Sequence, residues 1–405
     1  MKALAILNVL KHNKESGSSL SFIIIVKDWC DMNSWSSREI LFGLHEITGV
    51  GWRAIDAVQQ VIGWDQLHHW VDRKSDEWQE LGFKPNAAAR LATGLTSDYI
   101  NNKLELTYKS GTNWITMLDE SYPDLLKETI EPPWVLYGKG EWRLLKQPAV
   151  AMVGTRHATV YGKKVAYRLS ADLAARGLVV VSGLARGIDA AAHEGAMSTG
   201  CTIAVLGGSL QSIYPPEHTS LARRIAETGL LISEYSLDTA PRAGLFPRRN
   251  RIIAGLSLAT VVVEAALRSG ALITADHALD MSREVLAVPG PITSPKSEGP
   301  LKLLREGSKP AASAQDVIEE ITCQLTMLQF SDNNGTVTID DVTMNVVPLL
   351  ADEQLVMEQL EGHRATFDEL LVVTGLPFAQ LHSILLSLQL KKRIHEHTGG
   401  VYGSI

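Results

Sequence analysis

Two stretches, AVAMVGTR at residues 149–156 and LVVVSGLARGID at residues 178–189, decide the fold in the middle of this chain. Each is an apolar run that ends in a glycine-containing turn, a pattern typical of a buried strand. Between them, Val165, Leu169 and Leu173 recur every four residues and define one face of a helix. A strand, a helix and a strand in this order predict a βαβ unit with parallel strands.

The same alternation of strands and helices continues to about residue 321. Apolar runs at residues 202–206, 230–234, 259–263 and 285–288 predict four more strands, and helical patterns lie between them. The alternation predicts a doubly wound α/β domain with a mainly parallel sheet. Residues 135–137, which follow a pair of prolines, are expected to form an edge strand on this sheet.

The turns after the first two predicted strands carry residues that suit an anion. Ligands of doubly wound sheets bind at the carboxyl ends of the strands, and both turns lie at such ends. We therefore expect an anion site made of backbone amides together with Thr155, Arg156, Ser182 and Arg186.

A third segment, FPRRNR at residues 246–251, holds three arginines within four residues. The run fits either a cluster of internal salt bridges or contact with several phosphates, because guanidinium groups bind phosphate bidentately. In the second interpretation this segment joins Arg156 and Arg186, and five arginines face one crevice.

The fingerprints of common nucleotide sites are missing from these turns. The first turn reads GTRHA at residues 154–158 instead of G-x-G-x-x-G, and the sequence contains no G-x-x-x-x-G-K-[ST] pattern. A polymeric phosphate ligand therefore fits these arginines better than a dinucleotide or ATP.

The sequence offers little that predicts catalysis. Glu264, at the end of a predicted strand, is the best single carboxylate, but it lacks a partner carboxylate and is expected to be structural. Asp189 is expected to pair with Arg186 or to cap the helix that follows. No catalytic residue, metal site or cofactor is predicted. Four histidines are scattered and expected to be structural: His157, His193, His218 and His277.

Residues 32–115 predict a small helical domain. Within it, ITGVGWR at residues 47–53 resembles the turn of a helix-hairpin-helix, whose amides contact a DNA phosphate. The same pattern fits a glycine-rich turn between packed helices. LGFKP at residues 81–85 predicts a second hairpin. Residues 1–31 show no amphipathic period, so they are either a flexible tail or the product of an upstream start, with Met32 as the natural start.

The C-terminal part of the chain predicts a linker at residues 323–348 and a winged helix at residues 349–405. Three helical patterns are followed by a hairpin around Gly399 and Gly400. The segment expected as the recognition helix, residues 377–390, contains no arginine, whereas base reading usually needs Arg, Asn or Gln. A role in packing or protein contact is therefore at least as well supported as base reading.

Charge is distributed unevenly along the chain. Residues 140–310 hold 20 basic and 14 acidic residues, so this part carries +6, and the flanks carry −13 of the net −7. A uniformly DNA-coating protein is excluded, but a local anion-binding face is not. Three separated cysteines predict neither a zinc site nor a disulfide framework and fit a cytoplasmic protein. No apolar run is long enough for a transmembrane helix.

In combination, these motifs resemble the family of DNA-processing protein A, also called DprA or Smf. The resemblance extends from about residue 36 to residue 405 and rests on motifs that occur in the order of the family. They are the bridge from Tyr122-Pro123 to YGKG at 137–140, VGTR at 153–156, SGLARGID at 182–189, YPPE at 214–217, FPRRNRIIAGL at 246–256, RSGALITA at 268–275 and VPG at 288–290.

The resemblance implies a helical domain like a sterile alpha motif, an extended Rossmann-like domain at residues 116–322 and a winged helix. It also implies a non-enzymatic protein that binds single-stranded DNA, protects incoming DNA during natural transformation and helps to load the RecA recombinase. Such proteins usually form a homodimer through the Rossmann-like domain. The residues expected to bind DNA here are Gly154, Thr155, Arg156, Ser182, Gly183, Arg186, Gly187, Arg248, Arg249, Asn250 and Arg251.

The chain departs from the family at one corner of the expected pocket. The family usually has a Gly-x-Asn, where this chain has Gly299-Pro300-Leu301. The polar contact of that asparagine is therefore missing at Leu301.

Two other classes of protein fit this sequence less well than a DNA-binding module does. A nucleotide-hydrolysing enzyme of the lysine-decarboxylase-like fold needs a Pro-Gly-Gly-x-Gly-Thr loop, whereas residues 264–270 read EAALRSG. A winged-helix transcription regulator that senses a nucleotide is disfavoured by the arginine-poor helix at residues 377–390.

Overall fold

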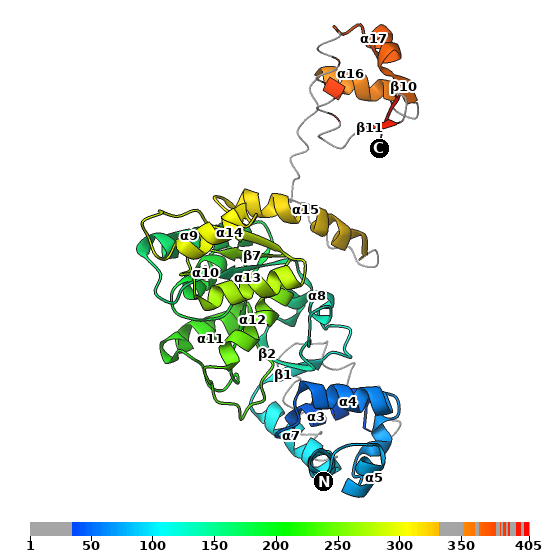
Figure 1. The fold of residues 1–405 in the computed structure, drawn as a ribbon, viewed down its shortest axis with the longest axis vertical. Helices are drawn as coiled ribbons and strands as arrows, with labels where there is room; N and C mark the ends of the chain where they lie inside the picture. The colour runs from blue at the N-terminus through cyan, green and yellow to red at the C-terminus, as the bar shows by residue number, and fades with distance from the viewer. Residues whose placement is uncertain are drawn as a thin grey trace, which may run out of the picture. The chain divides into compact units, whose positions relative to one another are not determined.

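A computed structural model describes residues 35–331, 351–360, 364–377, 394–397 and 401–404, together with positions 381, 384, 385 and 388. The chain divides into two compact units, residues 1–334 and residues 335–405 (Figure 1). The expected N-terminal extension, residues 1–31, and most of the expected linker lie outside the described residues.

The first unit begins with a helical domain, drawn in blue in Figure 1. Ser36 starts it with a capping box, because its hydroxyl accepts from the Glu39 amide and the Glu39 carboxylate accepts from the Ser36 amide. Thr96 caps the last helix through the amide of Tyr99. The helices are α3 (Ser37–Glu46), α4 (Trp52–Ile62), η3 (Leu67–Trp70), α5 (Ser75–Glu80), α6 (Pro85–Gly94) and α7 (Ser97–Lys109).

The helical domain packs directly on the large sheet of the same unit. The Trp52 and Trp134 rings stack with their centroids 5.2 Å apart. The Trp52 indole donates to the Pro132 carbonyl at 2.7 Å. The Tyr137 hydroxyl donates to the buried carboxylate of Glu46, and Lys103 pairs with that carboxylate at 3.2 Å. One continuous apolar cluster therefore runs from the helical domain to the sheet.

The described residues form a nine-stranded sheet in the order β1-β2-β6-β5-β4-β3-β7-β8-β9. The strands from β6 to β9 in this order are parallel, and chain order reverses between β3 and β7, as expected for a doubly wound α/β fold. The strands are β1 (Asn113–Thr116), β2 (Val135–Gly140), β3 (Ala149–Val153), β4 (Val179–Ser182), β5 (Thr202–Val205), β6 (Leu230–Ser233), β7 (Ala259–Val262), β8 (Glu284–Ala287) and β9 (Lys309–Pro310).

The sheet confirms the predicted α/β class and corrects one strand. Residues 135–137 do belong to a strand, β2, but it is not at the edge, because β1 pairs antiparallel on its outer side. The segment that forms β1, NWIT, is short and half polar, so hydrophobic pattern alone does not reveal it.

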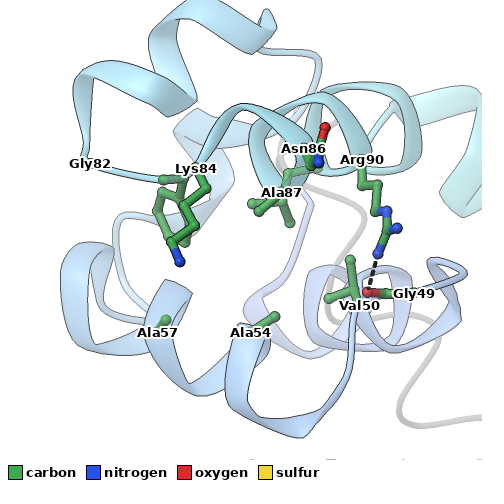
Figure 2. A pocket seen from close by; sticks show the side chains of 11 residues that line it. Gly49, Val50, Ala54, Ala57, Gly82, Lys84, Asn86, Ala87 and Arg90 are labelled. Carbon is green, nitrogen blue, oxygen red and sulfur yellow. Dashed lines mark hydrogen bonds between the residues drawn. The ribbon is translucent and has the colours of Figure 1, made fainter.

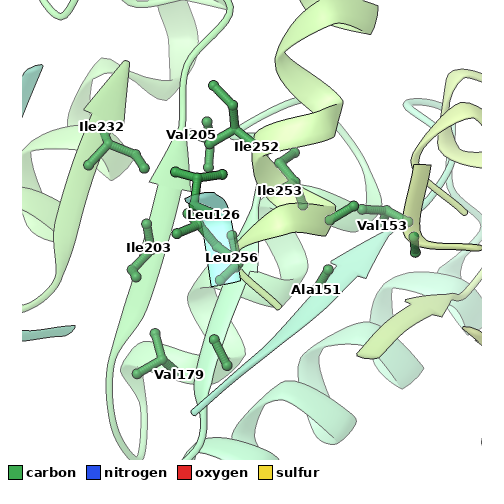
Figure 3. Close-up of a cluster of buried hydrophobic side chains, with 14 of the residues drawn as sticks. Leu126, Ala151, Val153, Val179, Ile203, Val205, Ile232, Ile252, Ile253 and Leu256 are labelled. Atoms are coloured by element: carbon green, nitrogen blue, oxygen red, sulfur yellow. The ribbon is translucent and has the colours of Figure 1, made fainter. Parts of the chain in front are cut away.

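Helices cover both faces of the sheet. On one face, Ile252 and Ile253 of α12 lie in one buried cluster with Ala151, Val153 and Val205 of the sheet (Figure 3), and burial of each isoleucine contributes roughly 2–3 kcal/mol. On the other face lie α9, α10 and α15. The helices are α8 (Asp124–Lys127), η4 (Trp142–Lys146), α9 (Val160–Ala174), α10 (Ile188–Met197), η5 (Pro216–His218), α11 (Thr219–Thr228), α12 (Leu245–Gly255), α13 (Gly270–Asp280), α14 (Glu298–Arg305) and α15 (Ala314–Ser331).

Helix α15 continues into the stretch expected as a linker. It ends at Ser331, whereas the sequence predicts a linker from residue 323. The sequence accounts for the difference, because Ile321, Leu325 and Leu328 continue the helical spacing of apolar residues.

The second unit has the elements of the predicted winged helix. Its sheet has the order β10-β12-β11, and β11 and β12 form the expected hairpin. Thr366 caps α17 with a capping box to Glu369, and Gly375 ends that helix in the left-handed region with φ 65°. The elements are α16 (Ala351–Leu360), β10 (Arg364–Thr366), α17 (Phe367–Thr374), β11 (Ile394–His397) and β12 (Val401–Ser404).

The expected recognition segment, residues 377–390, is only partly described. Leu381, Ile384, Leu385 and Leu388 are buried in the core of the unit at helical spacing, which agrees with a packing role for that face. The polar residues named as possible base readers, His382, Ser383, Ser387 and Gln389, lie outside the described residues.

Candidate nucleic-acid interface

The first two turns lie at the carboxyl ends of neighbouring parallel strands, as the doubly wound fold requires. Gly154, Thr155 and Arg156 follow β3, and the loop 183–187 follows β4. The Thr155 amide donates to the Glu264 carbonyl at 2.7 Å and fixes the first turn to the end of β7. Gly187 has φ 80°, and a Cβ there would lie 2.3 Å from the Thr155 carbonyl oxygen, so close packing of the two turns requires glycine.

Three buried or half-buried side chains hold the second loop in place around Leu184, whose φ of 59° is rare for a branched side chain. His193 Nε2 accepts from the Leu184 amide at 3.3 Å, and His218 Nδ1 donates to the Leu184 carbonyl at 2.8 Å. The Asp189 carboxylate accepts from the Ala185 amide at 3.3 Å. The loop is therefore a rigid platform.

The ionisation of these groups follows from burial. Burial lowers the pKa of the His193 imidazole to about 3, so the ring is neutral and accepts a hydrogen bond at Nε2. Burial also raises the pKa of the Asp189 carboxyl, although the charge of Arg249 opposes this shift. The structural role expected for His193 is confirmed, and Asp189 holds a loop amide instead of pairing with Arg186.

Residues from four segments form a small pocket of about 20 Å³ beside this platform. The Arg156 guanidinium lies 5.4 Å from the centre of the Phe246 ring. The Tyr214 ring, with 43% of the side chain exposed, lies 5.4 Å from Phe246. We call this site the arginine–aromatic pocket. It is lined by Arg156, Gly183, Ala185, Arg186, Tyr214, Pro215 and Phe246.

The pocket brings together two kinds of group, aromatic rings and guanidinium groups. The exposed Tyr214 ring and the half-buried Phe246 ring could offer flat surfaces to a nucleobase, and the two guanidinium groups could offer donors to phosphate oxygens. Arg186 also forms an ion pair, with its Nε 2.5 Å from the Glu217 carboxylate. That contact raises the pKa of Arg186 and lowers the pKa of Glu217.

The expectation that five arginines face one crevice is wrong for Arg249 and Arg251. Arg249 is 3% exposed, and its Nη1 donates to the carbonyl of Gly183 at 2.7 Å and to that of Val205. Arg251 is also buried and is paired with Glu234. The physical reason is the helical period, because Arg249 shares the sheet-facing side of α12 with Ile252 and Ile253.

Arg249 supports the pocket by its contact with the loop that follows β4. Burial lowers the pKa of its guanidinium to about 10, so it remains charged at neutral pH. A Cβ at Gly183 would lie 2.4 Å from this guanidinium, and glycine is therefore needed where Arg249 sits against the loop. The salt-bridge interpretation of the FPRRNR segment is thus correct for Arg251, whereas Arg249 donates to backbone carbonyls.

The remaining predicted residues lie near the pocket without lining it. Ser182 is buried, and its hydroxyl donates to the Met152 carbonyl at 2.6 Å, so it is not free for a ligand. Arg248 is half-exposed and lies 3.9 Å from Glu131. The Asn250 amide donates to the Gly270 carbonyl at 3.1 Å and helps to join α12 to α13.

Glu264 has the structural role expected for it. Its carboxylate is buried and accepts from the Thr159 amide at 2.9 Å and from the Thr159 hydroxyl at 2.5 Å, at the start of α9. Within the described residues, no group of three or more His, Cys, Asp or Glu side chains is arranged to hold a metal ion.

Among the residues at or beside the pocket, Tyr214, Phe246 and Glu217 are not among the predicted binding residues. A signal for the two rings existed, because each stands directly before a proline, in a loop or at the start of a helix near arginines. Glu217 gave no such signal, since only the fold brings it to Arg186.

The expected hairpins of the helical domain form a separate pocket of about 430 Å³ (Figure 2). It lies between the turn at Gly49 and the turn at Gly82, with Lys84 and Arg90 on its rim. The Arg90 guanidinium donates to the Gly49 carbonyl at 2.9 Å and closes one turn against α6. The glycine-rich turn is thus engaged in helix packing, and its contact with a DNA phosphate stays a prediction.

Comparison with known families gave two matches. A family model described as DNA recombination-mediator protein A matches residues 113–322, which include the arginine–aromatic pocket. A model described as the DprA winged helix domain matches residues 343–400.

Individual relatives gave the same result. The chain is 35% identical to Protein Smf from Escherichia coli over 368 residues, which cover 86% of this chain and 94% of that protein. It is 44% identical over 215 residues to DNA processing protein DprA from Bacillus subtilis, covering 53% of this chain and 72% of that protein. The X-ray structure of DprA from Streptococcus pneumoniae matches with a TM-score of 0.62 and 32% identity, over 70% of this chain and 97% of that one.

Proposed function

This chain belongs to the DNA recombination-mediator protein A family, also named DprA or Smf, and we propose that it binds single-stranded DNA in the arginine–aromatic pocket. One observation carries the proposal: Arg156 lies over the Phe246 ring, beside Tyr214 and Arg186, at the carboxyl ends of parallel strands. Aromatic rings beside arginines suit a ligand that has both flat bases and a charged backbone.

The preference for single strands follows from the aromatic rings. A base in a duplex is stacked on its neighbours and paired across the helix, so its faces are not free to lie on a protein ring. An unpaired strand can place a base on Tyr214 or Phe246, and stacking of this kind contributes about 1–3 kcal/mol per base. Arg156 and Arg186 would then contact the adjoining phosphates.

The wider biological role is part of the same proposal. Family membership supports a mediator that protects incoming DNA, helps to load RecA during natural transformation, acts as a homodimer and resides in the cytoplasm. In this proposal residues 116–322 bind DNA, residues 32–115 brace that domain, and residues 349–405 are a separate winged helix after a linker. We propose that the protein is not an enzyme.

Binding of labelled single-stranded and duplex DNA at two salt concentrations tests the proposal. We expect a preference for single strands, an affinity that falls with salt, and a loss of about tenfold or more for Arg156→Ala. Arg176→Ala is the matched control, since Arg176 is exposed at the opposite end of α9, roughly 22 Å along the helix. Unchanged binding by Arg156→Ala, or a preference for duplex, contradicts the assignment, and nucleotide turnover by the same sample would reinstate an enzyme.

A further inference from the structure

An acidic side chain lies against one of the two exposed arginines of the arginine–aromatic pocket. Glu217 lies in η5, directly after Tyr214 and the prolines, and its carboxylate is 2.5 Å from Arg186 Nε. The Arg186 side chain is 47% exposed and the Glu217 side chain is 50% exposed, so the pair lies at the mouth of the pocket and not in the core.

A carboxylate and a phosphate bind a guanidinium in the same way. A carboxylate is planar and a phosphate is tetrahedral, but the oxygens of each accept parallel N–H donors at about 2.7–2.9 Å. While the Glu217 oxygen lies against Arg186 Nε, that donor is not free for a phosphate oxygen. A phosphate that uses the same donor must therefore displace Glu217 into water.

The backbone around the pair makes displacement of the side chain the simplest route. The loop that carries Arg186 is fixed by Gly187 on one side and by the hydrogen bonds of Leu184 on the other. The exposed ends of Arg186 and Glu217 can move without disturbing that loop. Binding can thus exchange one anion for another at a preformed position.

We propose that Glu217 is a built-in competitor for the DNA phosphate at Arg186, an inference that rests on the proposed DNA-binding function. A free phosphate that contacts only Arg186 replaces one anion by another and gains little. A strand that also reaches Arg156 and stacks a base on Tyr214 or Phe246 has additional contacts to drive the exchange. Glu217 therefore selects for polymeric ligands that engage the whole pocket.

The opposite role for Glu217 is to hold Arg186 in the orientation that DNA needs. The two roles predict opposite signs when the carboxylate is removed. A competitor lowers affinity, so Glu217→Gln should bind DNA more tightly, whereas loss of a positioning group should weaken binding. An exposed ion pair of this kind changes an equilibrium by about two- to fivefold.

The experiment measures binding of labelled oligothymidylate by the full chain at one fixed salt concentration. We expect Glu217→Gln to bind two- to fivefold more tightly than the unmodified protein. Glu227→Gln, an exposed residue of α11 that changes the net charge equally, should leave affinity unchanged. In an Arg186→Ala background the gain from Glu217→Gln should vanish, because the contested donor is gone.

The outcomes separate the competitor from the function on which it rests. Equal or weaker binding by Glu217→Gln, or a gain that persists without Arg186, overturns the competitor. If Arg156→Ala weakens binding in the same assay, DNA binding by the pocket stands even when the competitor fails. If Arg156→Ala binds as tightly as the unmodified chain, the proposed function itself fails.

Discussion

Two pairs of arginines in this protein differ in what surrounds them. Arg156 and Arg186 extend from loops at the strand ends and are exposed, whereas Arg249 and Arg251 lie on α12 and are buried. Arg249 donates to the carbonyls of Gly183 and Val205, and Arg251 is paired with Glu234, so both buried charges are used inside the fold. The exposed pair leaves donors at the surface of the pocket. The position of an arginine in the fold therefore decides whether it stabilises the structure or is free to contact a ligand.

The largest expected effect comes from replacing Arg249, one of the two buried arginines. Arg249→Ala leaves two carbonyls without a donor and the buried Asp189 without its opposing charge, so we expect a loss of about 3–5 kcal/mol in the free energy of unfolding. Arg156→Ala, which removes an exposed side chain, should change stability by less than about 0.5 kcal/mol. Urea unfolding of both variants measures the contrast, and equal stabilities would remove it.

The next prediction concerns the Phe246 ring, which lies beside the exposed arginines. Phe246→Ala removes the surface on which a base is proposed to stack, and we expect a loss of about 1–3 kcal/mol in binding of single-stranded DNA. Tyr167→Ala, which removes an exposed ring from the surface of α9, serves as the control. Equal losses in the two variants, measured by fluorescence anisotropy, would show that the pocket is not special.

The platform should also make stability depend on pH through His193. The folded imidazole resists protonation down to a pKa of about 3, whereas the unfolded ring has the ordinary value near 6.5. The unfolded state therefore binds more protons in this window, so the contribution of His193 is fully present above pH 6.5 and falls on acidification. The slope reaches about 1.4 kcal/mol per pH unit. His193→Gln should unfold with a flatter dependence on pH, and an unchanged slope in urea titrations would exclude this role.

The smallest effect is expected in the salt dependence of binding. Each phosphate contact with a single strand contributes about 0.7 to the slope of log affinity against log salt concentration. Arg156→Ala should reduce the slope by about that amount, whereas Arg176→Ala should not change it. A slope that is equal in all three proteins would mean that Arg156 contacts no phosphate.

The sequence predicted the scaffold better than the site. Strands such as 149–153 and 202–205 were evident because a parallel sheet buried on both faces demands continuous apolar runs. The burial of Arg249 could in principle be predicted from the sequence, since Arg249 stands three and four residues before Ile252 and Ile253 and so shares their face of the helix. A run of arginines suggested a surface instead, because isolated charge is costly to bury.

Other parts of the site could not be predicted from local pattern. Glu217 and Arg186 lie 31 residues apart, and only the packing of two strand-end loops brings them together. Tyr214 and Phe246 likewise meet across separate segments. Such pairs depend on how loops close over the sheet, and hydrophobic periodicity carries no information about that closure.

The contact between the helical domain and the sheet limits how far this chain can be shortened from its N-terminal side. Trp134 and Tyr137 of the sheet region are covered by α3 and α4, through the stacked Trp52 ring and the Glu46 carboxylate. A chain shortened to begin at Asn113 would expose both aromatic residues to water and leave the Tyr137 hydroxyl without its carboxylate. Such a shortened chain would tend to aggregate. The helical domain is therefore part of the same packed unit as the sheet, and it covers apolar surface that the sheet would otherwise expose to water.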